Sequence, residues 1–167
     1  GHDYTFIGQA NDNVVVGKLS GATDLVKSGD GSLTLDLAND YSGTTKLEEG
    51  TLKLHDDNAL GNSTLSTAAG TTLGVGDGAD VVLKDNKHVI SGDVLVEKDS
   101  SLEIAGDVLY KAPSTKVDGT LIFSQDAVDH GSLTGSGTLE VTNGANVAFK
   151  DASNFTGSVK VCGMSLI

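Results

Sequence analysis

The residues of this sequence whose types could do chemistry are its histidines and the carboxylates beside them. His55 is followed by Asp56 and Asp57, and His130 is preceded by Asp129. An imidazole next to a carboxylate can bind a metal ion or act as a general base. No second ligand follows at a characteristic spacing, so we predict that the histidines are solvated turn residues. They are His2, His55, His88 and His130.

Three other sequence features could suggest chemistry: a calcium-binding motif, a cysteine and two N-glycosylation patterns. We predict a structural role for each. Residues 76–80, Gly-Asp-Gly-Ala-Asp, resemble part of a calcium-binding nonapeptide, but that motif needs tandem copies and this one stands alone, so we predict no calcium site. Cys162 is the only cysteine, which excludes an intramolecular disulfide and favours a small buried side chain. Asn62 and Asn154 begin N-glycosylation patterns, which we interpret as turn residues.

The composition argues against an enzyme and against polyanionic partners. All 11 basic residues are Lys, and the formal net charge is -12. Without Arg, binding of nucleic acid or of an anionic membrane is disfavoured, and so is a β-helical polysaccharide lyase, which neutralises sugar acids with Arg or calcium. We therefore predict no catalytic residue, no cofactor and no metal site. The acidity is expected to keep an extended β-structure soluble.

The elements that would position any site are short alternating strands that recur. The recurring unit is a small polar residue, Leu, any residue, and then an apolar residue. Its Leu positions lie 19, 21, 29, 19 and 18 residues apart. The units are Ser32–Leu35, Thr51–Leu54, Thr72–Val75, Ser101–Ile104, Thr120–Phe123 and Thr138–Val141. Alternation places the apolar residues of each unit on one face of a strand.

A period near 20 residues with about three strands per repeat predicts an all-β, parallel β-helix of about seven or eight coils. The equivalent apolar positions should stack into an interior ladder without room for a substrate. This ladder consists of Leu33, Leu35, Leu52, Leu54, Leu73, Leu102, Ile104, Leu121, Phe123, Leu139 and Val141. Gly31, Gly43 and Gly50 are expected at corners. Asp-Gly and Asn-Gly pairs leave a β-sandwich as the alternative, although it does not explain the regular spacing.

Two places depart from the regular spacing. The 29-residue step from Leu73 to Leu102 predicts an enlarged or irregular coil. The block from Gly29 to Leu52 recurs as Gly135 to Leu166 with eight extra residues after Val141, and either place could mark a capping element. One helical turn is possible at residues 56–60, ended by Gly61. We interpret residues 1–2 as a tag scar and residues 3–167 as a single β-helical domain, a fragment of a longer protein.

The stretch from Leu25 to about residue 73 resembles the β-strand repeat of bacterial autotransporter passenger domains. There, a Gly-x-Gly-Thr-Leu strand leads to Asn-x-Tyr-Ser/Thr-Gly, to a Gly-Thr-Leu strand and then to Asn-Ala-Leu-Gly. The corresponding segments here begin at Gly29, Asn39, Gly50 and Asn58. The resemblance is weaker over Gly135 to Leu166. It implies a right-handed parallel β-helix that crosses the periplasm and is exported through an outer-membrane β-barrel to the cell surface or beyond.

The resemblance also implies a function and partners. Such segments include the autochaperone region, which folds first and templates the coils behind it, so the expected partners are the neighbouring passenger coils and the translocator barrel. The parent is then a virulence factor, such as one that recruits host actin machinery. The alternative is an adhesin module that binds like molecules or host proteins through a charged outer patch. That patch would contain Lys46, Glu48, Glu49, Lys53 and Asp56.

Overall fold

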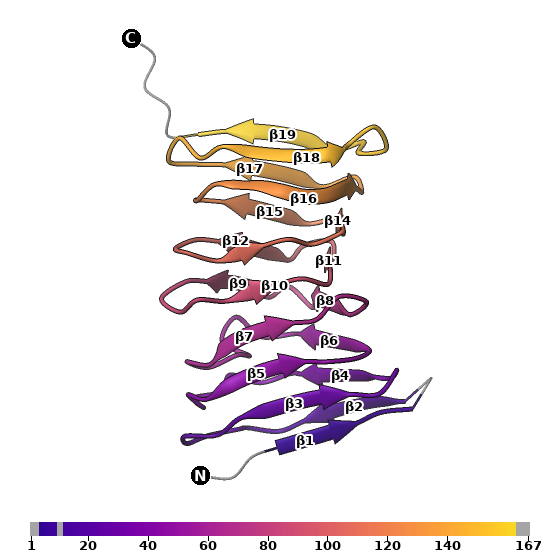
Figure 1. The fold of residues 1–167 in the computed structure, drawn as a ribbon, viewed down its shortest axis with the longest axis vertical. Coiled ribbons are helices and arrows are strands. Elements are labelled where there is room, and N and C mark those ends of the chain that lie inside the picture. The colour runs from indigo at the N-terminus through magenta and orange to yellow at the C-terminus, as the bar shows by residue number, and fades with distance from the viewer. Residues whose placement is uncertain (1–3, 10–11, 163–167) are drawn as a thin grey trace.

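Short strands wound into a rod make up the described chain. The computed structural model describes residues 4–9 and 12–162, and in these residues it contains nineteen strands and no helix. The strands lie across the long axis, with β1 at one end of the rod and β19 at the other (Figure 1). They form three sheets, which we call sheets A, B and C.

Each sheet collects strands from successive coils. Sheet A contains β1 (Tyr4–Ile7), β3 (Leu25–Ser28), β5 (Thr44–Leu47), β7 (Thr64–Thr67), β10 (Val89–Ile90) and β13 (Leu109–Tyr110). Sheet B contains β2 (Asn13–Val16), β4 (Ser32–Leu35), β6 (Thr51–Leu54), β8 (Thr72–Val75), β11 (Asp93–Val96), β14 (Ser114–Val117), β16 (Ala127–Thr134) and β18 (Val147–Asp151). Sheet C contains β9 (Asp80–Leu83), β12 (Ser101–Ile104), β15 (Thr120–Phe123), β17 (Thr138–Val141) and β19 (Ser158–Val161).

All pairings between these strands are parallel, and each strand pairs with its equivalent in the preceding coil, in the following coil or in both. Sheet B supplies one strand to each of eight coils, which begin at β1, β3, β5, β7, β10, β13, β16 and β18. The prediction of a parallel β-helix of about seven or eight coils is confirmed. A sandwich built from hairpins is excluded, because hairpins require antiparallel pairs.

The interior ladder differs from the prediction in one respect. All eleven predicted residues lie in the core, with the exposed fraction rising from zero at Leu33 to 9% at Val141. They form ladders on two sheets, however, because Leu33, Leu52 and Leu73 stack in sheet B whereas Leu102, Leu121 and Leu139 stack in sheet C.

The change of sheet explains the 29-residue step. Leu73 pairs with Val94, 21 residues later, and Leu102 pairs with Val81, 21 residues earlier. Both coils are therefore regular. The prediction of an enlarged coil between Leu73 and Leu102 was wrong, since the recurring unit moves from one sheet to the next within an ordinary period.

The third side of the rod changes along its length. In coils 1 to 3, residues 17–24, 36–43 and 55–63 are turns and loops, and sheet C begins only at β9 in coil 4. The possible helical turn at residues 56–60 is a set of hydrogen-bonded turns, in which the Ala59 amide donates to the Asp56 carbonyl. Gly61, with φ +56°, ends it, in a conformation that glycine adopts without steric cost.

Sheet A ends as sheet C extends. Its last strand is β13, and the eight-residue strand β16 then runs from the sheet A side into sheet B with a bulge between Ala127 and His130. The eight extra residues after Val141 hold β18, an ordinary strand of sheet B, so they form no separate cap. Among the described residues, no helix has the length and apolar character needed to cross a membrane.

Candidate functional site

The loop wall of coils 1 to 3 is held together by buried polar side chains, and Asn39 is the central one. Its Oδ1 accepts the Leu19 amide at 2.7 Å, and its Nδ2 donates to the Ala59 carbonyl at 2.6 Å. Its own amide donates to the Asn58 carbonyl at 3.0 Å. Leu19, Asn39 and Ala59 belong to three successive coils. One side chain therefore supplies the bonds that a sheet would otherwise provide.

A second buried network links coils 2 and 3 beside Asn39. Tyr41 is fully buried, and its hydroxyl is bonded to Thr45 Oγ1. Thr45 Oγ1 lies 2.7 Å from Ser63 Oγ, which donates to the Leu60 carbonyl at 2.6 Å. Burial raises the pKa of Tyr41, so the phenol stays a neutral partner at physiological pH.

Lys27 is a charged residue in the interior ladder of sheet A. It pairs with Leu47 in the next coil and is 2% exposed. Its Nζ donates to the carbonyls of Ser28 at 2.8 Å, Gly29 at 2.7 Å and Glu49 at 3.2 Å, and so ties coil 2 to coil 3 at the corner between sheets A and B.

Burial lowers the pKa of Lys27, and the carboxylates of Glu49 and Asp30 offset part of this effect. The sequence interpretation did not single out Lys27. Its place two residues after Leu25 in an alternating strand is the signal that assigns it to the inner face.

Two histidines that we predicted to be solvated are buried. His88 is 4% exposed; its Nδ1 accepts the Leu65 amide at 2.9 Å, and its Nε2 donates to the Lys84 carbonyl at 3.1 Å. Burial lowers the pKa of His88, consistent with a neutral ring whose two nitrogens both have roles. The prediction failed because the residue lies in the inward register of sheet A, next to Leu65, although it belongs to a polar stretch of sequence.

His130 is buried in an aromatic cluster in coils 6 to 8, so the prediction failed here too. Its Nε2 donates to the Ala127 carbonyl at 2.7 Å. Its ring centroid lies 4.2 Å from that of Phe149, 5.3 Å from Tyr110 and 6.0 Å from Phe123. The Tyr110 hydroxyl is bonded to Thr115 Oγ1 at 2.7 Å. His2 lies outside the described residues.

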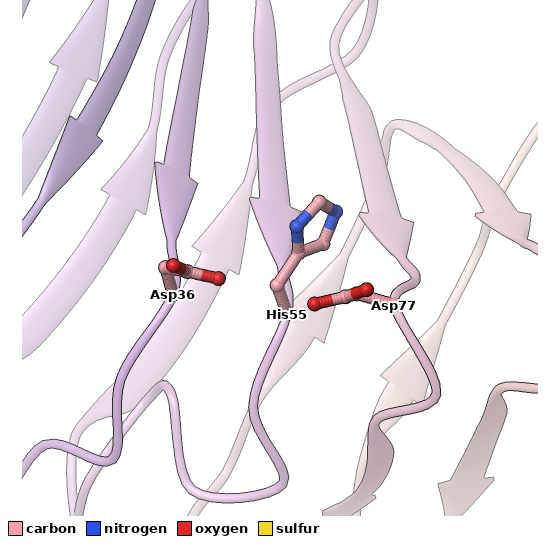
Figure 2. A group of neighbouring side chains, drawn as sticks. All are labelled: Asp36, His55 and Asp77. Carbon is pink, nitrogen blue, oxygen red and sulfur yellow. The ribbon is translucent and has the colours of Figure 1, made fainter.

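His55 is half-buried at the end of β6, where the structure brings it together with Asp36 and Asp77 (Figure 2). Each offers one ligand atom, and these atoms all lie within 4.8 Å of one another. The carboxylates next to His55 in sequence bond to backbone amides instead. Asp56 Oδ1 accepts the Asn58 amide, and Asp57 Oδ1 accepts the Asp80 amide.

The sequence interpretation missed this group because its members are 19 and 22 residues apart. The available signal was register: Asp36 and His55 each follow the last Leu of equivalent strands, Leu35 and Leu54, which pair directly. The rest of segment 76–80 does not converge on a common point, since the Asp80 carboxylate accepts from Ser101 Oγ at 2.7 Å in the next coil.

A cleft of about 400 Å³ opens where sheet C begins. It lies between the turn at residues 57–63 and the edge of β9, and its polar lining includes Asp57, Asn62, Asp85 and Asn86. Asn62 and Asn154 are exposed and lie in turns. Cys162 is only half-buried; burial raises the pKa of its thiol, and its Sγ lies 3.4 Å from a Glu140 carboxylate oxygen.

The predicted charged patch is divided between two faces. Lys46 lies on sheet A and Lys53 on sheet B, with the exposed side chains of Glu48 and Glu49 at the corner between them. Asp56 follows the far end of β6.

One family comparison bears on these coils. Residues 25–54 match the passenger-associated transport repeat, and these residues are strands β3 to β6 with their connecting turns. No curated protein and no solved structure matches the chain significantly. The matched segment contains Lys27, Asn39 and Tyr41, the residues that tie coils 1 to 3 together. The chain is therefore a β-solenoid segment that carries a passenger-associated transport repeat, the repeat typical of autotransporter passenger domains.

Proposed function

We propose that the chain is a non-enzymatic stem of a surface-displayed passenger, and that coils 1 to 3 act as its autochaperone-type folding nucleus. The observation that carries this proposal is the bonding of Asn39, whose side chain reaches one coil on each side of its own. Both bonds form only when three coils are stacked. Formation of the first coils is therefore cooperative, and the product is a fixed edge on which another coil can grow.

The sequence distance between partners supports early folding of this part. The residues that Asn39 joins are 20 positions apart in the chain, so each coil closes a short loop before it gains its contacts. Parallel sheets usually fold slowly because their contacts are remote in sequence. A solenoid of short coils reduces that entropic cost.

The two end coils of the described chain support a templating role. Val14 of coil 1 and Val159 and Val161 of coil 8 occupy inward register positions, yet they are 40%, 61% and 57% exposed. Exposed apolar positions of this kind are suited to stacking against other passenger coils. In this proposal, those coils and the outer-membrane translocator are the partners, and the cell surface, reached through the periplasm, is the location.

Refolding kinetics test the proposal. After dilution from denaturant, the wild-type chain should recover its far-UV circular dichroism spontaneously. Asn39→Ala should slow refolding by about tenfold, because a nucleus contact is lost. Asn146→Ala, at an exposed position just before β18, is the matched control and should refold at the wild-type rate. A chain that stays unfolded, or an Asn39→Ala effect confined to the unfolding rate, would contradict the proposal.

The adhesin alternative depends on the exposed charges at the corner between sheets A and B. Reversing Glu48 and Glu49 to Lys leaves the loop wall intact. If the module works by self-association, this change should alter aggregation of cells that display it. Unchanged aggregation with intact folding supports the stem function.

A further inference from the structure

The group formed by Asp36, His55 and Asp77 has its geometry set by the backbone of the solenoid. The His55 amide donates to the Leu35 carbonyl, and the Gly76 amide donates to the Leu54 carbonyl, both at 3.0 Å. The positions that follow β4, β6 and β8 are therefore held one strand spacing apart from coil to coil, roughly 4.8 Å. The three side chains extend from the ends of β4, β6 and β8 (Figure 2). Three donors from three coils are positioned before any ligand arrives.

Coil 4 departs from the simple stack in a way that opens space beside the imidazole. Gly76 occupies the position equivalent to His55, and the next residue, Asp77, has φ +57°. Asp is among the residues that tolerate this left-handed conformation. Asp36 and His55 are the first residues after their strands, whereas Asp77 is the second residue after β8. Asp77 nevertheless contributes a ligand atom to the same group.

The missing side chain at Gly76 has a second consequence. A Cβ there would collide with the Glu97 carboxylate of coil 5, and it would lie 3.3 Å from His55 Nε2. Glu97 Oε2 and His55 Nε2 therefore border the same small space. A fourth donor, a carboxylate oxygen, stands next to the group.

The three side chains have no competing partners in the part of the chain that the structure describes. None of them takes part in a side-chain hydrogen bond or a salt bridge there, whereas the neighbouring Asp56, Asp57 and Asp80 carboxylates are all engaged. Three unengaged acceptors close together, in a protein of net charge -12, create a negative potential that a cation would relieve.

We propose that Asp36, His55 and Asp77 bind one divalent transition-metal ion of the zinc class. An imidazole nitrogen with two carboxylate oxygens is a donor set for zinc or a similar borderline ion, whereas calcium and magnesium prefer oxygen alone. Glu97 or water completes the coordination. The bound ion links coils 2, 3 and 4. Coils 2 and 3 contain the passenger repeat, and coil 4 is the first coil with a strand in sheet C. The inference is independent of the proposed folding role.

Titration with zinc alone tests the site. After dialysis against a chelator, isothermal titration calorimetry should give one zinc ion per chain, and zinc should raise the unfolding temperature. His55→Gln and Asp36→Asn should each weaken binding at least tenfold and abolish the thermal shift. These variants keep His2, so binding at the N-terminus would survive in them and be recognised. The matched control is Asp107→Asn, an exposed aspartate between β12 and β13 and outside the group, which should bind zinc like the wild type.

A signal from the imidazole itself separates ligation from general charge attraction. Zinc should shift the ring resonances of His55 in proton–nitrogen NMR spectra while those of the buried His88 stay in place. The proposal is overturned if zinc fails to bind at millimolar concentration, if His55→Gln binds with wild-type affinity, or if Asp107→Asn loses as much affinity as Asp36→Asn.

Discussion

Coils 1 to 3 and coils 6 to 8 have the same rod-like interior but complete its third side by different means. In coils 1 to 3 a wall of loops is held by side-chain hydrogen bonds that involve Asn39 and Tyr41. In coils 6 to 8 the third side is sheet C, and the space behind it holds the aromatic cluster of Tyr110, Phe123, His130 and Phe149.

The difference follows from where backbone groups find partners. A sheet satisfies its own amides and carbonyls, so the side chains behind it can be apolar and bulky. A loop wall leaves those groups without a ladder, and buried polar side chains must supply the missing bonds. Each region also contains a buried tyrosine bonded to a threonine, Tyr41 to Thr45 and Tyr110 to Thr115, so the same pair serves both constructions.

The largest expected effect comes from sheet B, which both regions share. Leu52→Asp places an unpaired charge between Leu33 and Leu73, at a position without solvent exposure. We expect the free energy of unfolding to fall by more than about 4 kcal/mol, so that the far-UV circular dichroism spectrum is that of an unfolded chain. Lys53→Asp, one residue later on the outer face, should remain folded. A folded Leu52→Asp protein would show that sheet B is not the common support.

A smaller effect should separate the two regions. Phe123→Ala removes the centre of the aromatic cluster, which is fully buried, and should lower the free energy of unfolding by about 3–5 kcal/mol. Hydrogen exchange should then speed up in coils 6 to 8 before it does so in coils 2 and 3. Equal acceleration in both regions would mean that the rod unfolds as one unit and that the two constructions are not separable.

The smallest effect concerns His88, which directly precedes β10 and lies between the two regions. Its pKa is lowered by burial, so its contribution to stability is complete above the ordinary histidine pKa of about 6.5 and falls as the pH drops toward the folded-state value. Protonation would set an N–H against the Leu65 amide. Urea unfolding at about pH 7.5 and about pH 5.5 should show a lower midpoint in acid. His88→Asn should reduce that difference, and an unchanged difference would assign the acid sensitivity to other groups.

The strands and the class of fold could be predicted because the alternation of polar and apolar residues and the repeat are both visible in the amino-acid sequence. Ser32–Leu35 and Ser101–Ile104 are recognisably the same unit. Their assignment to different sheets could not be predicted, because alternation identifies the inner face of a strand but not which side of the rod it occupies. Without the sheet assignment, the step from Leu73 to Leu102 was predicted to be an irregular coil, although the coils there are regular.

The polar interior was harder to predict for a related reason. Lys27 and Asn39 are residue types that usually lie at the surface, and the histidine of His88 is an intermediate type. Their burial becomes visible only when strand bounds and register are known. The group of Asp36, His55 and Asp77 depends on register even more, since no two of its members are near in sequence and the carboxylates beside His55 in the chain are occupied elsewhere.

The orientation of the strands across the rod, seen in Figure 1, has a mechanical consequence. A pull along the long axis loads the hydrogen bonds of one coil at a time, as in opening a zipper, whereas a pull along the strands would load many bonds in shear. Under axial tension the rod therefore unravels coil by coil from its ends. Side chains that span several coils, as Asn39 does, are the points at which such unravelling has to pause, because three coils must be released together.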